Sequence, residues 1–121
     1  VKDNYWPFIK PQENGNKTDV RWATLTNNDG VGILVRSIDQ NLSMSAHHYT
    51  LENLTNALHT PDVVNEGDIT LNIDLKQMGV GGDDSWNPRI HPEFLLREEN
   101  YSYSFSIRPI DLKEKNLEEY L

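Results

Sequence analysis

Apolar and polar residues alternate with a period of two along several segments, and this pattern constrains the fold more than any other feature of the chain. In residues 101–108, Tyr101, Tyr103, Phe105 and Ile107 alternate with serines and a final arginine. Residues 68–75 repeat the pattern, with isoleucine or leucine at every second position. Successive side chains of a β-strand point to opposite faces, so this period predicts strands that turn one apolar face inward.

A β-hairpin is predicted between residues 21–26 and 31–38, because Asn, Asn, Asp and Gly separate the two segments. These residue types tolerate the positive φ angles that tight hairpin loops require. Leu42, Met44 and Ala46 continue the alternation in the next segment. About six short strands with little helix predict an all-β fold, an antiparallel β-sandwich, and not an α/β nucleotide-binding fold.

One short helix is predicted to begin at Leu51, with the Thr50 hydroxyl as its N-cap. Leu51, Leu54 and Leu58 would share one face of this helix, as in an amphipathic segment. Pro61 should close it, because proline cannot continue a helix from within.

Length and composition indicate one globular domain, which we assign to residues 1–110, followed by a charged tail at residues 111–121 that forms a marginal helix or stays disordered. Nineteen acidic residues against eleven basic ones give a net charge of −8. That charge disfavours phosphate-rich partners, so no nucleic-acid role is expected.

No apolar run approaches the roughly 20 residues of a membrane-spanning helix, so no membrane association is expected. The chain has no cysteine, which excludes disulfides and cysteine nucleophiles.

Residues 78–88, with the sequence MGVGGDDSWNP, form the strongest candidate for a functional loop. Three glycines in four positions remove side chains where the backbone turns tightly or approaches another group. Trp86 follows, and Pro88 stiffens the chain after it. A flat apolar ring on a stiff loop suits the apolar C–H face of a sugar. The alternative is a tight turn whose tryptophan packs into the core.

Four other groups of polar residues are weaker candidates. Asp83 and Asp84 are adjacent, so their side chains should diverge, whereas a catalytic pair of carboxyl groups has to face a substrate from two sides, about 5–5.5 Å apart. They would instead accept hydrogen bonds from turn amides or bind a hard cation.

Glu13 lies on a loop before the hairpin and either lines a cleft or braces that loop. His47 and His48 should point to opposite faces of a strand, so no metal site is assigned. Arg21 and Trp22 are expected on a sheet face.

Three blocks of sequence, in this order and spacing, resemble the C-terminal domain of large bacterial β-galactosidases of glycoside hydrolase family two. The blocks are KPQENGNKTDVRW at residues 10–22, LNIDLKQ at residues 71–77 and MGVGGDDSW at residues 78–86. The similarity runs from about Tyr5 to Pro109. The family domain is a two-sheet sandwich of the galactose-mutarotase-like supersandwich type. The resemblance implies that this chain corresponds to its C-terminal, small-chain part.

The resemblance also implies a function, namely a non-catalytic domain of an enzyme that hydrolyses terminal non-reducing β-D-galactosides such as lactose. The catalytic carboxylates of the family belong to a barrel domain that nothing in this chain matches. The tryptophan that corresponds to Trp86 reaches the mouth of the active site, where it forms a platform for the leaving-group sugar. Asp83, Asp84 and Glu13 carry over only as residues that could line the cleft.

Cofactors, partners and location follow from the same resemblance. Divalent and monovalent cations of the parent enzyme would bind in other domains, and none is expected in this chain. The partners would be the remaining domains and a lactose-like galactoside. The protein would be soluble and bacterial, and the sequence does not choose between cytoplasm and periplasm.

A different class of function stays open at this point, a stand-alone carbohydrate-binding or interaction module that uses Trp86 and other aromatic residues. Such a module should bind saccharides by itself, whereas a domain separated from its enzyme should bind them weakly or not at all. A separated domain should also expose apolar surface and strand edges. We therefore expect the isolated chain to self-associate through residues 5–8 (Tyr-Trp-Pro-Phe) or an edge strand.

Overall fold

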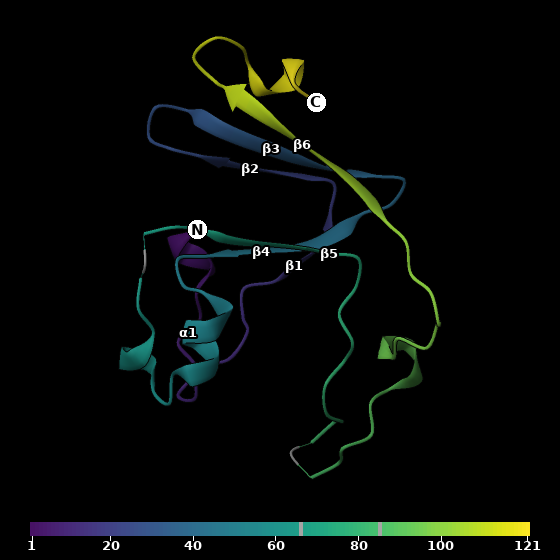
Figure 1. Ribbon diagram of the computed structural model, residues 1–121. Helices are drawn as coiled ribbons and strands as arrows, with labels where there is room; N and C mark the ends of the chain where they lie inside the picture. Colours follow the sequence, from purple (N-terminus) through teal and green to yellow (C-terminus); the bar gives the residue numbers. More distant parts are fainter. Residues whose placement is uncertain (66, 85) are drawn as a thin grey trace. The chain divides into compact units, whose positions relative to one another are not determined.

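The computed structural model describes residues 1–65, 67–84 and 86–121 (Figure 1). In this part of the chain the strands are β1 (Lys17–Val20), β2 (Trp22–Thr26), β3 (Val31–Ile38), β4 (Leu42–His47), β5 (Thr70–Asp74) and β6 (Ser104–Asp111). The helical elements are α1 (Leu51–Asn56) and the single 3-10 turns η1 (Lys2–Asn4), η2 (Thr60–Asp62), η3 (Pro92–Phe94) and η4 (Leu117–Glu119). The predicted all-β class is confirmed, with antiparallel sheets and almost no helix, as in a β-sandwich. None of these helices is long and apolar enough to cross a bilayer.

The chain divides into two compact units, each built from two separate stretches of sequence. The first unit comprises Val1–Asp19 and Ser43–Asp74, and the second comprises Val20–Leu42 and Leu75–Leu121. One sheet, in the order β1-β4-β5, belongs to the first unit together with α1, except for the strand-end residues Val20 and Leu42, which fall in the second. The other sheet, in the order β2-β3-β6, belongs to the second unit.

The predicted hairpin is confirmed as β2 and β3, which pair antiparallel from Trp22 opposite Arg36 to Thr26 opposite Gly32. The Asn27 side-chain oxygen accepts hydrogen bonds from the backbone N–H groups of Asp29 at 2.9 Å and Val31 at 3.1 Å. Gly30 adopts φ +82°, a left-handed conformation that glycine reaches without a steric penalty. The hairpin is therefore closed as predicted, but of the four loop residues only Gly30 uses a positive φ, and Asn27 contributes through its side chain instead.

Strand β6 differs from its predicted position and from its predicted burial. It begins at Ser104, opposite Ile38, so residues 101–103 lie beyond the last residue of β3 with which the strand can pair. The apolar alternation was expected to face inward, but Phe105 is 39% exposed and Ile107 is 53% exposed. The reason is that no other part of the described chain covers the face that carries Phe105 and Ile107, whereas Ile110, on the opposite face of the strand, is buried.

The first unit is organised around β4, in which every residue is buried. The predicted N-cap of α1 is confirmed, since the Thr50 hydroxyl accepts a hydrogen bond from the backbone N–H of Asn53 at 3.1 Å. The predicted shared apolar face of the helix is wrong. Leu54 is buried, but Leu51 and Leu58 are 61% and 65% exposed. The helix ends at Asn56, so it is too short to carry a continuous apolar stripe.

Candidate functional site

Trp86 lies in the second unit, on the irregular segment that connects β5 to β6. Its side chain is 93% exposed. The indole therefore does not pack into a core of this chain, which removes the alternative of a purely structural core tryptophan within the described residues. Ser85, the residue before it, lies outside those residues.

The backbone at Trp86 is held by the carboxylate of Asp84. One oxygen of that carboxylate accepts hydrogen bonds from the backbone N–H groups of Trp86 and Asn87, both at 2.8 Å. The side-chain oxygen of Asn87 in turn accepts a hydrogen bond from the Arg89 N–H at 3.0 Å. Asp84 thus takes the first of the two roles considered for it, as an acceptor for turn amides.

Three glycines of the motif occupy positions that a larger residue could not take without a change in the loop. A Cβ atom on Gly82 would lie 2.4 Å from the Asn87 carbonyl oxygen. A Cβ on Gly79 would lie 2.8 Å from the Cβ of Phe94, whose carbonyl oxygen accepts the Gly79 N–H. Gly81 adopts φ +79°. Close approach and backbone conformation together explain the glycine-rich sequence.

Asp83 has a different partner from its neighbour. Its carboxylate oxygen lies 2.6 Å from Nε2 of His91, and both side chains are largely exposed. The two adjacent carboxylates therefore diverge, as expected, and do not form a catalytic pair. The contact with His91 was not predicted, because the two residues are eight positions apart on a segment whose path follows no regular period.

Glu13 is exposed and belongs to the first unit. The loop that carries it is braced by its neighbour Asn14, whose side chain accepts the Trp6 N–H at 2.9 Å and donates to the Tyr49 hydroxyl at 2.9 Å. Burial raises the pKa of that hydroxyl above its usual value. His47 stacks on the Tyr49 ring with centroids 4.7 Å apart, and its Nε2 lies 2.7 Å from the Asn14 carbonyl oxygen. These groups form a structural network around the loop.

Metal ligands do not gather in the part of the chain that the structure describes. No group of three or more histidine, cysteine, aspartate or glutamate residues there is arranged to hold an ion.

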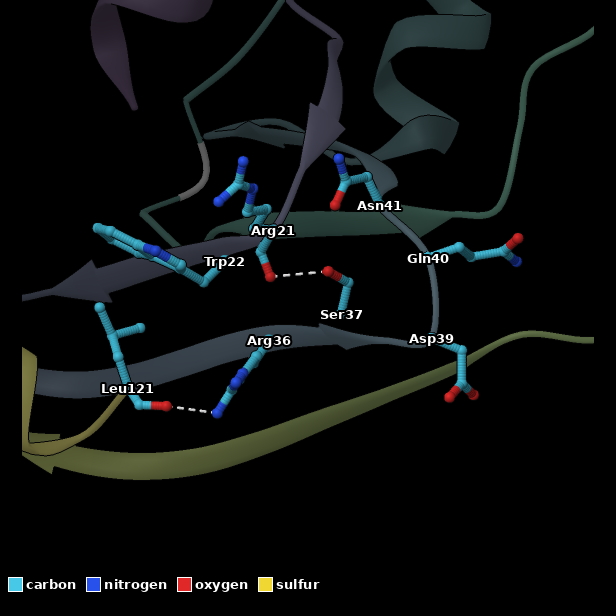
Figure 2. Close-up of a pocket in the computed structure, with 8 residues that line it drawn as sticks. All are labelled: Arg21, Trp22, Arg36, Ser37, Asp39, Gln40, Asn41 and Leu121. Atoms are coloured by element: carbon cyan, nitrogen blue, oxygen red, sulfur yellow. Dashed lines mark hydrogen bonds between the residues drawn. The ribbon is translucent and has the colours of Figure 1, made fainter.

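A pocket of about 390 Å³ opens on the second unit, beside the hairpin (Figure 2). Its lining comes from the start of β2, the end of β3, the β3–β4 connection and the last residue of the chain. The lining residues are Arg21, Trp22, Arg36, Ser37, Asp39, Gln40, Asn41 and Leu121. Arg21 and Trp22 were expected only on a sheet face. The sequence did not predict the pocket, because the pocket depends on the strand register and on the position of Leu121 next to Arg36, and both are features of the tertiary structure.

A family model described as "Beta galactosidase small chain" matches residues 1–107. The chain belongs to this family. The Trp86 loop and the hairpin lie inside the matched range, whereas η4 at the end of the chain lies outside it.

Known relatives of this β-galactosidase small-chain domain are themselves called β-galactosidases. The protein of Priestia megaterium is 39% identical over 111 residues, which cover 91% of this chain and 11% of the relative. The protein of Leuconostoc mesenteroides is 37% identical over 106 residues, covering 88% of this chain and 10% of the relative. The protein of Psychromonas ingrahamii is 40% identical over 103 residues, covering 85% and 9%. The small-chain domain therefore spans about a tenth of the length of these relatives, which does not favour the alternative of a stand-alone module.

Proposed function

We propose that this small-chain domain is part of a β-galactosidase of glycoside hydrolase family two that hydrolyses terminal non-reducing β-D-galactosides such as lactose. The domain by itself is non-catalytic, and the remaining domains supply the catalytic carboxylates and any cations. Its contribution is Trp86, which forms a platform for the leaving-group sugar at the mouth of the active site. The family match and the names of the relatives support the enzymatic context.

The observation that carries the role of Trp86 is an indole with 93% exposure on a loop whose backbone is held by hydrogen bonds. An indole left in solvent forgoes the favourable free energy of burying its apolar surface, and a ligand that covers the ring recovers that free energy. An aromatic face matches the C–H face of a pyranose, and a held backbone lowers the entropy lost on binding. Both properties favour a platform over a residue that fills space.

The contacts of the two loop carboxylates support a binding role for this domain and a catalytic role for the other domains. Asp84 is occupied by two backbone N–H groups, and Asp83 lies against His91. A retaining mechanism needs a nucleophile and an acid/base pair facing each other across the sugar. These two carboxylates hold the loop, so bond cleavage requires groups from the rest of the enzyme.

The test is Trp86→Ala in the complete enzyme. An aromatic ring against a sugar contributes about 0.5–1.5 kcal/mol beyond its area, and 1.36 kcal/mol corresponds to about tenfold. A platform binds the ground state and the transition state alike, so kcat/KM for lactose should fall about tenfold, mainly through a higher KM. Substrates with a small aglycone should be affected less, and Trp86→Phe or Trp86→Tyr should retain part of the wild-type affinity.

Val80→Ala is the matched control, because Val80 lies on the same loop with the same 93% exposure but has no aromatic ring. It should leave KM unchanged. Thermal denaturation of each variant separates binding from folding. The platform role is refuted if Trp86→Ala lowers the melting temperature strongly while the KM of the folded enzyme for lactose stays the same.

A further inference from the structure

We propose that the pocket beside Trp22 is a second saccharide site of this domain, which binds a short neutral sugar. The pocket lies entirely in the second unit, and its lining does not include Trp86. Its volume of about 390 Å³ lies in the range of small-molecule sites, about 300–1,000 Å³. The inference is independent of the role of Trp86 and adds a site to the same domain.

Polar side chains in the pocket are available to a ligand. Among the described residues, the side chains of Arg21, Asp39 and Asn41 have no hydrogen bond or ion pair within the chain, and neither does that of Gln40. A guanidinium donates hydrogen bonds, a carboxylate accepts them, and an amide does both. A sugar hydroxyl also donates and accepts, so each of these groups can pair with a hydroxyl of a saccharide in the pocket.

Trp22 adds an apolar wall to these polar groups. It is 40% exposed and pairs across the hairpin with Arg36, which places the two side chains on the same face of the sheet. The indole of Trp22 with the guanidinium of Arg36 on the same face matches a sugar ring, which has an apolar C–H face and a polar edge.

The walls of the pocket are tied together by the fold itself. The Ser37 hydroxyl donates a hydrogen bond to the Arg21 carbonyl oxygen at 2.7 Å, which joins the two strands of the hairpin at its open end (Figure 2). Arg36 donates to the backbone carbonyl oxygen of Leu121, which holds the end of the chain beside the pocket (Figure 2). A site that is already formed loses less entropy when it binds.

The charges of the lining favour a neutral sugar over an anion. Two guanidinium groups share the pocket with the carboxylate of Asp39, and the whole chain carries a net charge of −8. An anion would gain from the arginines but would face both the aspartate and the negative field of the protein. A neutral, hydroxyl-rich ligand uses the donors and the acceptor without that cost.

The experiment is a titration of the 121-residue chain with galactose and lactose, at a protein concentration below that at which light scattering detects self-association, followed by the NMR chemical shifts of its backbone amides. We expect weak, millimolar binding that shifts the amides around Trp22 and Arg36. Trp22→Ala and Arg21→Ala should each weaken the binding about tenfold, the factor that corresponds to about 1.4 kcal/mol. Trp86→Ala should leave it unchanged, which separates this site from the proposed platform.

Two further probes, galacturonate and inorganic phosphate, test the charge argument at constant ionic strength. Binding of either anion more tightly than galactose would overturn the proposal in favour of an anion site. The absence of saturable shifts with galactose and lactose would also overturn it, as would loss of binding in Trp86→Ala alone. If Trp22→Ala fails to fold, Arg21→Ala and Asn41→Ala carry the test, because neither side chain has a partner within the described chain.

Discussion

Replacement of Asp84 by alanine should release the backbone at Trp86 without unfolding the domain. One carboxylate oxygen accepts two backbone N–H groups, each at 2.8 Å. A hydrogen bond contributes about 0.5–1.5 kcal/mol net, and exposed bonds lie at the low end of that range. Loss of both bonds should therefore favour the open loop by about 1–1.5 kcal/mol, or roughly tenfold in the closed-to-open ratio.

Amide hydrogen exchange measured by NMR reports this ratio directly, because the two N–H groups exchange with solvent only when their hydrogen bonds open. In Asp84→Ala, the amides of Trp86 and Asn87 should exchange about tenfold faster than in the wild type. Asp84→Asn keeps a neutral acceptor and should give an intermediate rate. Asp83→Ala is the matched control, since that carboxylate contacts His91 and neither of these amides.

The amides of β3 serve as an internal reference for global stability. The reasoning is refuted if the Trp86 and Asn87 amides exchange at wild-type rates in Asp84→Ala. A parallel rise in the β3 amides would show that Asp84 supports the whole unit and not the loop alone. In the complete enzyme, Asp84→Ala should raise the KM for lactose, but less than Trp86→Ala does, because the ring itself remains.

Four other outcomes are expected. The isolated chain should hydrolyse no chromogenic β-galactoside, and turnover that disappears on changing Asp83 or Asp84 would contradict this. The isolated chain should self-associate through apolar groups such as Trp6, which is 65% exposed, or along the β6 edge with Ile107. Light scattering that shows a strict monomer at high concentration, without hydrophobic-dye binding, would argue against self-association. Thr50→Ala should cost about 1 kcal/mol in chemical denaturation by removing the N-cap of α1, whereas Thr50→Ser should not. Backbone hydrogen bonds, chiefly from the His59 N–H, lower the pKa of Asp62. The contribution of this carboxylate to the free energy of unfolding is therefore present at neutral pH and is lost as the pH falls through the lowered pKa. A stability difference between wild type and Asp62→Asn that stays constant down to acidic pH would disprove this prediction.

Local residue preferences, without any tertiary contact, determine several features of this protein. The hairpin follows from Asn27 and Gly30, because an asparagine side chain caps its own loop and glycine reaches positive φ. The start of α1 follows from Thr50, because a hydroxyl can accept the free N–H groups of a first turn. The family resemblance followed from three blocks of sequence, and the family match confirmed the β-galactosidase small chain.

Only the tertiary structure decided which apolar residues are covered. The alternation in β6 predicts a strand, but it carries no information on whether a second layer lies over that strand. Ile110 is buried whereas Ile107, on the same strand, is exposed. The end of β3 also decides where β6 begins, because a strand extends only as far as its neighbour offers hydrogen-bonding groups.

The two candidate sites divide in the same way. The glycines and Trp86 lie within one short segment, so the sequence alone predicts the loop. Only the contact between Asp83 and His91 depends on how the folded chain runs. The pocket beside Trp22 was not visible, because its walls come from both strands of the hairpin, a connection and residue Leu121 at the far end of the chain. Residues that are distant in sequence form a site only through strand register and chain return, and those depend on packing across the whole unit and not on local preference.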